Sequence, residues 1–124
     1  MALAINTQTR SEPRNEITFL LEGNLDNSTA GMLEGQMLPT LSAKPRWVIF
    51  DLAGLKFITS AGLRLFLMAV KRQKEHGGHV SFVNLQPQIK EVFAIMGSLP
   101  DTRIFKDNAE LDAYLTARQK TYEP

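Results

Sequence analysis

Hydroxyl and carboxylate side chains gather in two short segments of this 124-residue sequence. The first, LEGNLDNSTA at residues 21–30, carries Asp26, and the second, FITSAG at residues 57–62, carries Thr59 and Ser60. Both precede segments with helical character, where a Ser or Thr hydroxyl commonly caps the free N–H groups of the first turn. The same N–H groups and the positive end of the helix dipole can also hold a phosphate. The residues alone favour capping and leave phosphorylation open.

Other arrangements that carry chemistry are missing from the sequence or weakly supported. There is no GxxxxGK[ST] loop and no GxGxxG after a strand, so nucleotide binding of those kinds is not predicted. His76 and His79 flank a Gly-Gly turn without a third ligand nearby, which favours solvated turn residues over a metal pair. No GxSxG segment exposes a nucleophilic serine. We therefore expect no catalytic residues, no metal and no cofactor, and the sequence does not predict an enzyme.

Composition narrows the functional classes further. Lys and Arg number 14 against 13 Asp and Glu, so a net charge of +1 gives no general attraction to nucleic acid or to an acidic membrane. No apolar run approaches the roughly 18 residues of a membrane helix, and the N-terminus lacks the basic and apolar regions of a signal peptide. The absence of cysteine excludes disulfides and thiolate metal sites. We expect a cytoplasmic protein with neither a nucleic-acid partner nor direct membrane insertion.

Four segments have the pattern of β-strands. Residues 2–9 alternate weakly, which is typical of an edge strand, and EITFLLEG at 16–23 has apolar residues on both faces. WVIFDL at 47–52 and HVSFVNL at 79–85 are apolar runs typical of buried strands that helices cover. A fifth, short strand is predicted at Thr102–Phe105.

Helical spacing appears between and after these strands. Segment 61–76 carries an apolar stripe that we expect to face the core: Leu63, Phe66, Leu67 and Val70. PQIKEVFAIMG at 87–97 and DNAELDAYLTARQ at 107–119 predict two further helices. A helix within 28–42 should kink or end near residue 38, because Pro39 would clash with the carbonyl of Gly35.

The order of elements is therefore β-β-α-β-α-β-α, followed by a short β and a final α. Repeated β-α-β units require right-handed crossovers and a largely parallel central sheet. We predict one α/β domain over residues 1–124, with a mixed sheet of four to five strands, about four helices mainly on one face, and an edge formed by residues 3–9. Strand carboxyl ends feed helix N-termini in such a sheet, so both polar loops should meet at one edge.

Several short motifs in this order resemble one known family. L-x-G-x-L-D-x-x-T-A at 21–30 and F-I-T-S-A-G-L at 57–63 are similar to the two loops of the anti-sigma factor antagonists, whose domain is called STAS. GGHVSFVNLQPQIKEVFAIMG and F-K-D-N-A-E-L-D-A-Y-L are similar to the family's later strand and helices. The resemblance covers about residues 3–118, and it implies a single STAS-type domain.

The resemblance also implies site residues. In the family the second loop usually runs D-S-[ST]-G-L, and its first serine accepts a phosphate; aligned on Gly62, this serine is Ser60. Thr59 stands at the usual acidic position, where it is a second candidate hydroxyl, and Ala61 replaces the second hydroxyl. The residues expected to contact a partner are Asp26, Asn27, Thr29, Thr59, Ser60, Ala61, Gly62 and Arg64.

The function that the resemblance implies is partner switching. The unphosphorylated protein would bind an anti-sigma factor that is a serine/threonine kinase, and would thereby free a sigma factor. Phosphorylation of Ser60 would end this binding, and a metal-dependent serine phosphatase would restore it.

Two other functions remain open for a STAS-like chain. One is a soluble accessory subunit of a membrane transporter of the lipid or ABC type, which the non-acidic Thr59 leaves open. The other is a scaffold component of a large stress-sensing assembly.

Overall fold

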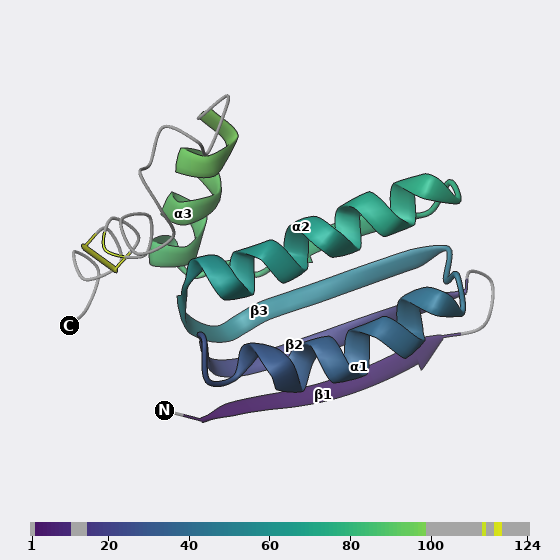
Figure 1. Ribbon diagram of the computed structural model, residues 1–124, viewed down its shortest axis with the longest axis horizontal. Helices are drawn as coiled ribbons and strands as arrows, with labels where there is room; N and C mark the ends of the chain where they lie inside the picture. Colours follow the sequence, from purple (N-terminus) through teal and green to yellow (C-terminus); the bar gives the residue numbers. More distant parts are fainter. Residues whose placement is uncertain (1, 11–14, 99–112, 114–115, 118–124) are drawn as a thin grey trace.

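A mixed sheet with the order β1-β2-β3-β4 organises the computed structural model (Figure 1), which describes residues 2–10, 15–98, 113 and 116–117. Its strands are β1 (Leu3–Arg10), β2 (Glu16–Leu25), β3 (Trp47–Ile58) and β4 (His79–Val83). β1 pairs antiparallel with β2, whereas the β2–β3 and β3–β4 pairs are parallel. The predicted mixed α/β sheet with an N-terminal edge strand is confirmed.

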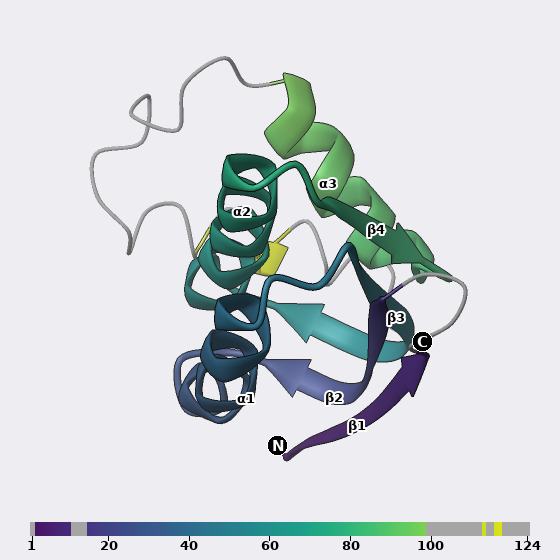
Figure 2. The same ribbon diagram turned by 90° about the vertical axis from the view of Figure 1, so that its right-hand side faces the viewer.

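Three helices follow the strands in alternation: α1 (Ala30–Ser42), α2 (Ser60–Glu75) and α3 (Pro87–Ser98). Figures 1 and 2 show α1 and α2 side by side over one face of the sheet, with α3 at a steep angle to both. This arrangement matches the predicted one-sided cover. The predicted strand Thr102–Phe105 lies outside the described residues, as does most of the predicted helix 107–119, of which Ala113, Thr116 and Ala117 are described and helical.

Stacked phenylalanines form the centre of the core. Phe19, Phe50 and Phe82 are neighbours in register on three strands, and each adjacent pair stacks with ring centroids 5.4 Å apart. Phe66 from α2 lies 4.9 Å from Phe50, and Phe93 from α3 lies 5.1 Å from Phe82. Ring pairs at such separations add stability beyond their buried area. The same cluster therefore fixes α2 and α3 against the sheet.

The single tryptophan of the chain lies at the start of β3 and belongs to the other face of the sheet, because strand side chains alternate and Val48 is buried in the core. The half-buried Trp47 ring lies 4.7 Å from the ring of His79, its partner in register on β4. Its Nε1–H donates a hydrogen bond of 2.8 Å to Ser81 Oγ. This contact ties the β3–β4 pair together on the face without α1 and α2.

The strands β2 and β3 extend further than the sequence predicted. β2 continues to Leu25 instead of ending at residue 23, and β3 continues to Ile58 instead of ending at residue 52. Their pairing shifts register after Leu20 and again after Gly23, which lets the ladder pass the irregular segment around Gly54. These continuations were not predicted, because polar residues interrupt the apolar runs by which strands are recognised in a sequence. β4, in contrast, ends at Val83, earlier than predicted.

The buried face of α2 differs from the predicted stripe. Leu63 and Phe66 are buried as expected, but Leu67 is 54% exposed and Val70 is 40% exposed. The buried face instead contains Gly62, Leu63, Leu65, Phe66, Ala69 and Gln73. Both stripes have helical spacing, and the second includes a glycine and a glutamine, which a search for apolar residues passes over.

The prediction was that the first helix kinks or ends near residue 38, and the ending was wrong, since α1 includes Pro39 and continues to Ser42. Leu33, Met37 and Leu41 on both sides of the proline are buried, so their packing favours a continuous helix. Proline removes the hydrogen bond to the Gly35 carbonyl, but Gly35 is exposed, and water can satisfy that oxygen. Among the described residues, no helix is long and apolar enough to cross a membrane.

Gln73 joins three elements from a position that is only 1% exposed. Its Nε2 donates hydrogen bonds of 2.9 Å to the Pro45 carbonyl and 3.2 Å to the His79 carbonyl. Its Oε1 is 2.8 Å from His76 Nε2. The amide thereby links the last turns of α2 to the segments that lead into β3 and β4.

Replacing Gln73 with leucine should lower the free energy of unfolding by about 1–3 kcal/mol, because the buried Pro45 carbonyl and the partly buried His79 carbonyl lose this donor. The exposed neighbour Lys74 provides the control, and Lys74→Leu should change the value by less than about 0.5 kcal/mol. Urea denaturation of both variants tests this. Equal values for the two variants would contradict a structural role for the buried amide.

Candidate functional site

The two polar loops lie side by side because β2 and β3 are parallel partners up to their carboxyl ends. Leu25 pairs with Ile58 at the end of the ladder, and the Thr59 N–H donates a hydrogen bond of 3.0 Å to the Leu25 carbonyl. Figure 1 shows α1 and α2 beginning at the same end of the sheet. The predicted meeting of both loops at one edge is confirmed.

Asp26 organises the first loop. Its Oδ1 accepts hydrogen bonds from the Ser28 N–H at 2.9 Å, the Ser28 hydroxyl at 2.7 Å and the Thr29 N–H at 3.2 Å. The buried Thr29 hydroxyl accepts from the Asp26 N–H at 2.9 Å and donates to the Asn24 carbonyl at 2.9 Å. Sequence reasoning did not predict the contact between Ser28 and Asp26, although Asp followed two residues later by a donor is the signature of a turn closed by the Asp side chain.

The charge of Asp26 is stabilised by this turn. Partial burial raises the pKa of the carboxyl, but the hydrogen bonds from Ser28 and Thr29 together outweigh burial and lower the pKa below its ordinary value of 3.8. At neutral pH the loop therefore presents a carboxylate whose Oδ1 atom is already engaged with Ser28 and Thr29.

Thr59 and Ser60 begin α2 in different roles. Thr59 is the extended N-cap residue, its carbonyl accepts from the Leu63 N–H at 2.9 Å, and its side chain makes no capping hydrogen bond. Its hydroxyl instead donates to Asn27 Oδ1 at 3.3 Å, which connects the two loops. Capping by the Thr59 side chain is thus not found. Ser60, the first residue of the helix, is half-buried.

Gly62 lets α2 lie directly against the end of β2. A Cβ atom at this position would be 2.5 Å from Leu25 Cγ and 3.0 Å from the Leu25 carbonyl oxygen, closer than side chains tolerate. Ala61 is half-buried and Arg64 is exposed on the following turn. The edge therefore brings together all eight predicted contact residues in one region, with Asn27 and Arg64 the most accessible of them and Thr29 and Gly62 buried.

A family model described as STAS domain matches residues 4–111, which is most of the chain. The chain belongs to the STAS domain family. The domain includes both loops and all of the elements that position them. Among the described residues, no group of three His, Cys, Asp or Glu side chains is placed to hold a metal ion.

Known proteins support the same assignment. The chain is 34% identical over 79 residues to BtrV of Bordetella bronchiseptica, described as a candidate anti-sigma factor antagonist; the match covers 64% of this chain and 68% of BtrV. The unphosphorylated form of the anti-sigma factor antagonist SpoIIAA superposes with a TM-score of 0.67 at 20% identity, over 76% of this chain and 81% of SpoIIAA. The phosphorylated form of the Bacillus protein gives a TM-score of 0.64 at 20% identity, over 76% and 84%. These two likenesses show that the fold is shared.

The close contact at Gly62 yields a prediction with a matched control. Gly62→Ala should lower the free energy of unfolding by about 1–3 kcal/mol, because the added methyl group forces Leu25 or α2 to move. A Cβ atom at Gly35 on α1 would have no neighbour within 4 Å. Gly35→Ala should therefore raise the free energy of unfolding by up to about 1 kcal/mol, because alanine has the better helix propensity. Urea denaturation measures both, and a neutral Gly62→Ala would refute the close approach.

The Asp26 turn predicts a pH dependence. Because the pKa is lower in the folded protein, the carboxylate stabilises the fold above pH 3.8, and this contribution is lost as the pH falls through the lowered pKa. Asp26→Ala should lower the free energy of unfolding by about 0.5–2 kcal/mol at pH 7, as the loss of other contacts at the start of a helix does. The difference in the free energy of unfolding between Asp26→Ala and wild type should become smaller below pH 3.8. Glu34→Ala, at an exposed position of α1, is the control in the same denaturation series.

Proposed function

We propose that this protein is an anti-sigma factor antagonist whose unphosphorylated form binds an anti-sigma factor and so releases a sigma factor. Membership of the STAS family and the likeness to BtrV and SpoIIAA support this class of activity. The observation that carries the proposal is the position of Ser60, half-exposed at the first residue of α2 and beside the Asp26 loop. The protein would act by binding, and the anti-sigma factor would be the enzyme.

A phosphate on Ser60 would change the edge without changing the fold. The first turn of a helix has N–H groups without acceptors within the helix, and these groups favour a phosphate together with the helix dipole. The phosphate adds about −1.5 to −2 charges and three acceptor oxygens to the surface. In an interface formed around a neutral hydroxyl, such a charge has to be desolvated without a partner, which costs several kcal/mol. This is the physical basis of the proposed switch.

The proposed partners follow from this chemistry. The anti-sigma factor would be a serine/threonine kinase that modifies Ser60 with ATP, and a metal-dependent serine phosphatase would remove the phosphate. These reactions place the protein in the cytoplasm. The surface offered to the kinase would be the edge formed by Asn27, Thr59, Ser60 and Arg64.

Thr59 makes this edge neutral at a position where the family usually has an acidic residue. Its hydroxyl donates a hydrogen bond to Asn27 Oδ1, so it connects the two loops. The kinase would meet a neutral side chain next to Ser60. We therefore expect recognition to depend on Arg64 and on the Asp26 loop more than on a carboxylate beside Ser60.

The test combines binding with intact mass. Ser60→Ala should bind the anti-sigma partner persistently in the presence of ATP, because it keeps the shape of the edge but cannot accept a phosphate. Ser60→Asp should bind at least about tenfold more weakly, which corresponds to about 1.4 kcal/mol of binding free energy. Calorimetric titration of each purified variant against the anti-sigma factor measures the affinities.

Thr59→Ala separates the two candidate hydroxyls. This variant should still gain the mass of one phosphate after treatment with the kinase and ATP, whereas Ser60→Ala should gain none. Equal affinities for wild type and Ser60→Asp, together with no mass gain on wild type, would overturn the switch. Capture of a transporter ATPase in place of a kinase would then assign the chain to a transporter complex.

A further inference from the structure

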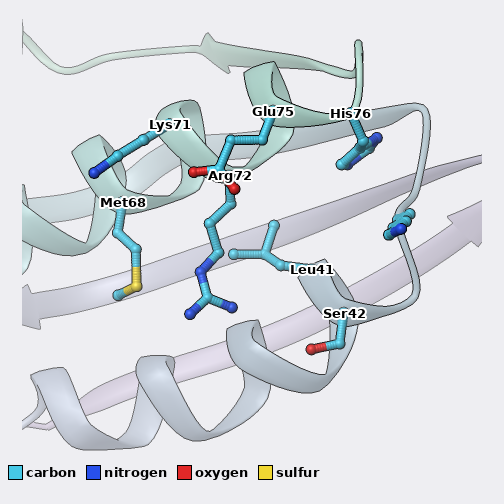
Figure 3. Close-up of a pocket in the computed structure, with 8 residues that line it drawn as sticks. Leu41, Ser42, Met68, Lys71, Arg72, Glu75 and His76 are labelled. Atoms are coloured by element: carbon cyan, nitrogen blue, oxygen red, sulfur yellow. The ribbon is translucent and has the colours of Figure 1, made fainter.

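A groove lies between the second half of α2 and the end of α1, away from the proposed phosphorylation site (Figure 3). Its volume is about 650 Å³, and the residues that line it are Leu41, Ser42, Lys44, Met68, Lys71, Arg72, Glu75 and His76. Figure 3 shows Met68 and Arg72 reaching from α2 toward α1, with Leu41 and Ser42 on the α1 side. Two helices thus supply opposite walls of one groove.

The lining combines an apolar floor with a basic rim. Leu41 is buried and Met68 is half-buried, so these two side chains form the apolar surface. Lys44, Lys71 and Arg72 are exposed around it, and Glu75 is the single acidic residue among the described residues of the lining. Three cations against one carboxylate is a marked local excess in a chain whose net charge is +1.

The three basic side chains of the groove form no ion pairs within the part of the chain that the structure describes. None of Lys44, Lys71 and Arg72 takes part in an ion pair with another described residue. Arg72 lies in the last turn of α2, where a cation suits the helix dipole. Lys44 lies two residues after the end of α1, where a cation also suits the helix dipole, and it adopts a φ of 55°, a conformation that favours glycine or asparagine. A lysine is thus present at a backbone position that disfavours it, next to the groove.

We propose that this groove binds an acidic segment of a protein partner. Glu and Asp side chains of the segment would pair with Lys44, Lys71 and Arg72, and an apolar side chain would cover Leu41 and Met68. Methionine adapts its shape to different apolar partners, which suits peptide binding. Single-stranded nucleic acid is bound by aromatic platforms, and no Phe, Tyr or Trp lines the groove among the residues that the structure describes. Charge complementarity and the apolar floor therefore favour an acidic polypeptide.

The groove is separate from the Ser60 edge. Helix α2 begins at Ser60 and carries Arg72 in its last turn, and a rise of ~1.5 Å per residue separates these two positions by about 20 Å. A partner in the groove can therefore stay bound whether or not Ser60 carries a phosphate. This second surface goes beyond the proposed function, and its test requires neither an anti-sigma factor nor a kinase.

The experiment measures binding of a fluorescein-labelled peptide of repeating Glu-Glu-Leu to the full chain by fluorescence anisotropy at low salt. The groove variant is Lys71→Glu/Arg72→Glu. The matched control is Arg46→Glu/Lys74→Glu, which reverses two exposed cations near the same end of the molecule but outside the groove lining. The groove variant should bind at least about tenfold more weakly than wild type, and the control should stay within about threefold. A Gln-Gln-Leu peptide should not bind.

Further measurements keep the result decisive. Lys71→Gln/Arg72→Gln should also bind the Glu-Glu-Leu peptide more weakly than wild type. Circular dichroism should confirm that all variants are folded. In NMR titration, the peptide should shift amide signals of residues 41–44 and 68–76, and Ser60→Asp should bind it like wild type. Equal loss in groove and control variants, or no shifts in these segments, would overturn the proposal. Tighter binding of oligothymidylate through the same residues would assign the groove to nucleic acid instead.

Discussion

The parallel pairing of β2 with β3, maintained up to Leu25 and Ile58, is the constraint on which the rest of the structure depends. It brings two loops that are far apart in the sequence to one edge, and the hydrogen bond from Thr59 to the Leu25 carbonyl closes the ladder there. The absence of a side chain at Gly62 then allows α2 to begin directly against β2. Ser60 is consequently placed at this edge by the backbone geometry of the strand-to-helix junction.

The two loops divide their tasks. The Asp26 loop is closed by hydrogen bonds among its own residues. The second loop consists of one residue, Thr59, between the end of β3 at Ile58 and the start of α2 at Ser60. A rigid strand-to-helix junction of this kind allows a change of charge to act on a binding partner without a rearrangement of the domain.

Much of this arrangement could be predicted from the sequence, because short polar motifs after apolar runs indicate strand ends in an α/β fold. The order of elements, the edge strand and the meeting of the loops follow from that rule. The buried face of α2 could not be predicted, since the stripe through Leu67 and the stripe through Gln73 have the same spacing and only packing decides between them. The full length of α1 depends likewise on burial of Leu41 beyond Pro39. The basic groove joins residues of two helices, and no pattern along the chain shows that they are neighbours.

The pairing of Trp47 with His79 and Ser81 gives the protein an internal optical reporter. As the only tryptophan, Trp47 dominates the long-wavelength fluorescence, and its half-buried ring is held by contacts that exist only while β3 and β4 are paired. It lies at the opposite end of β3 from Ser60, so a substitution or the proposed phosphorylation at that serine would leave its surroundings unchanged. Loss of the sheet can thus be observed by emission in every variant of the edge, without a label and on one common scale.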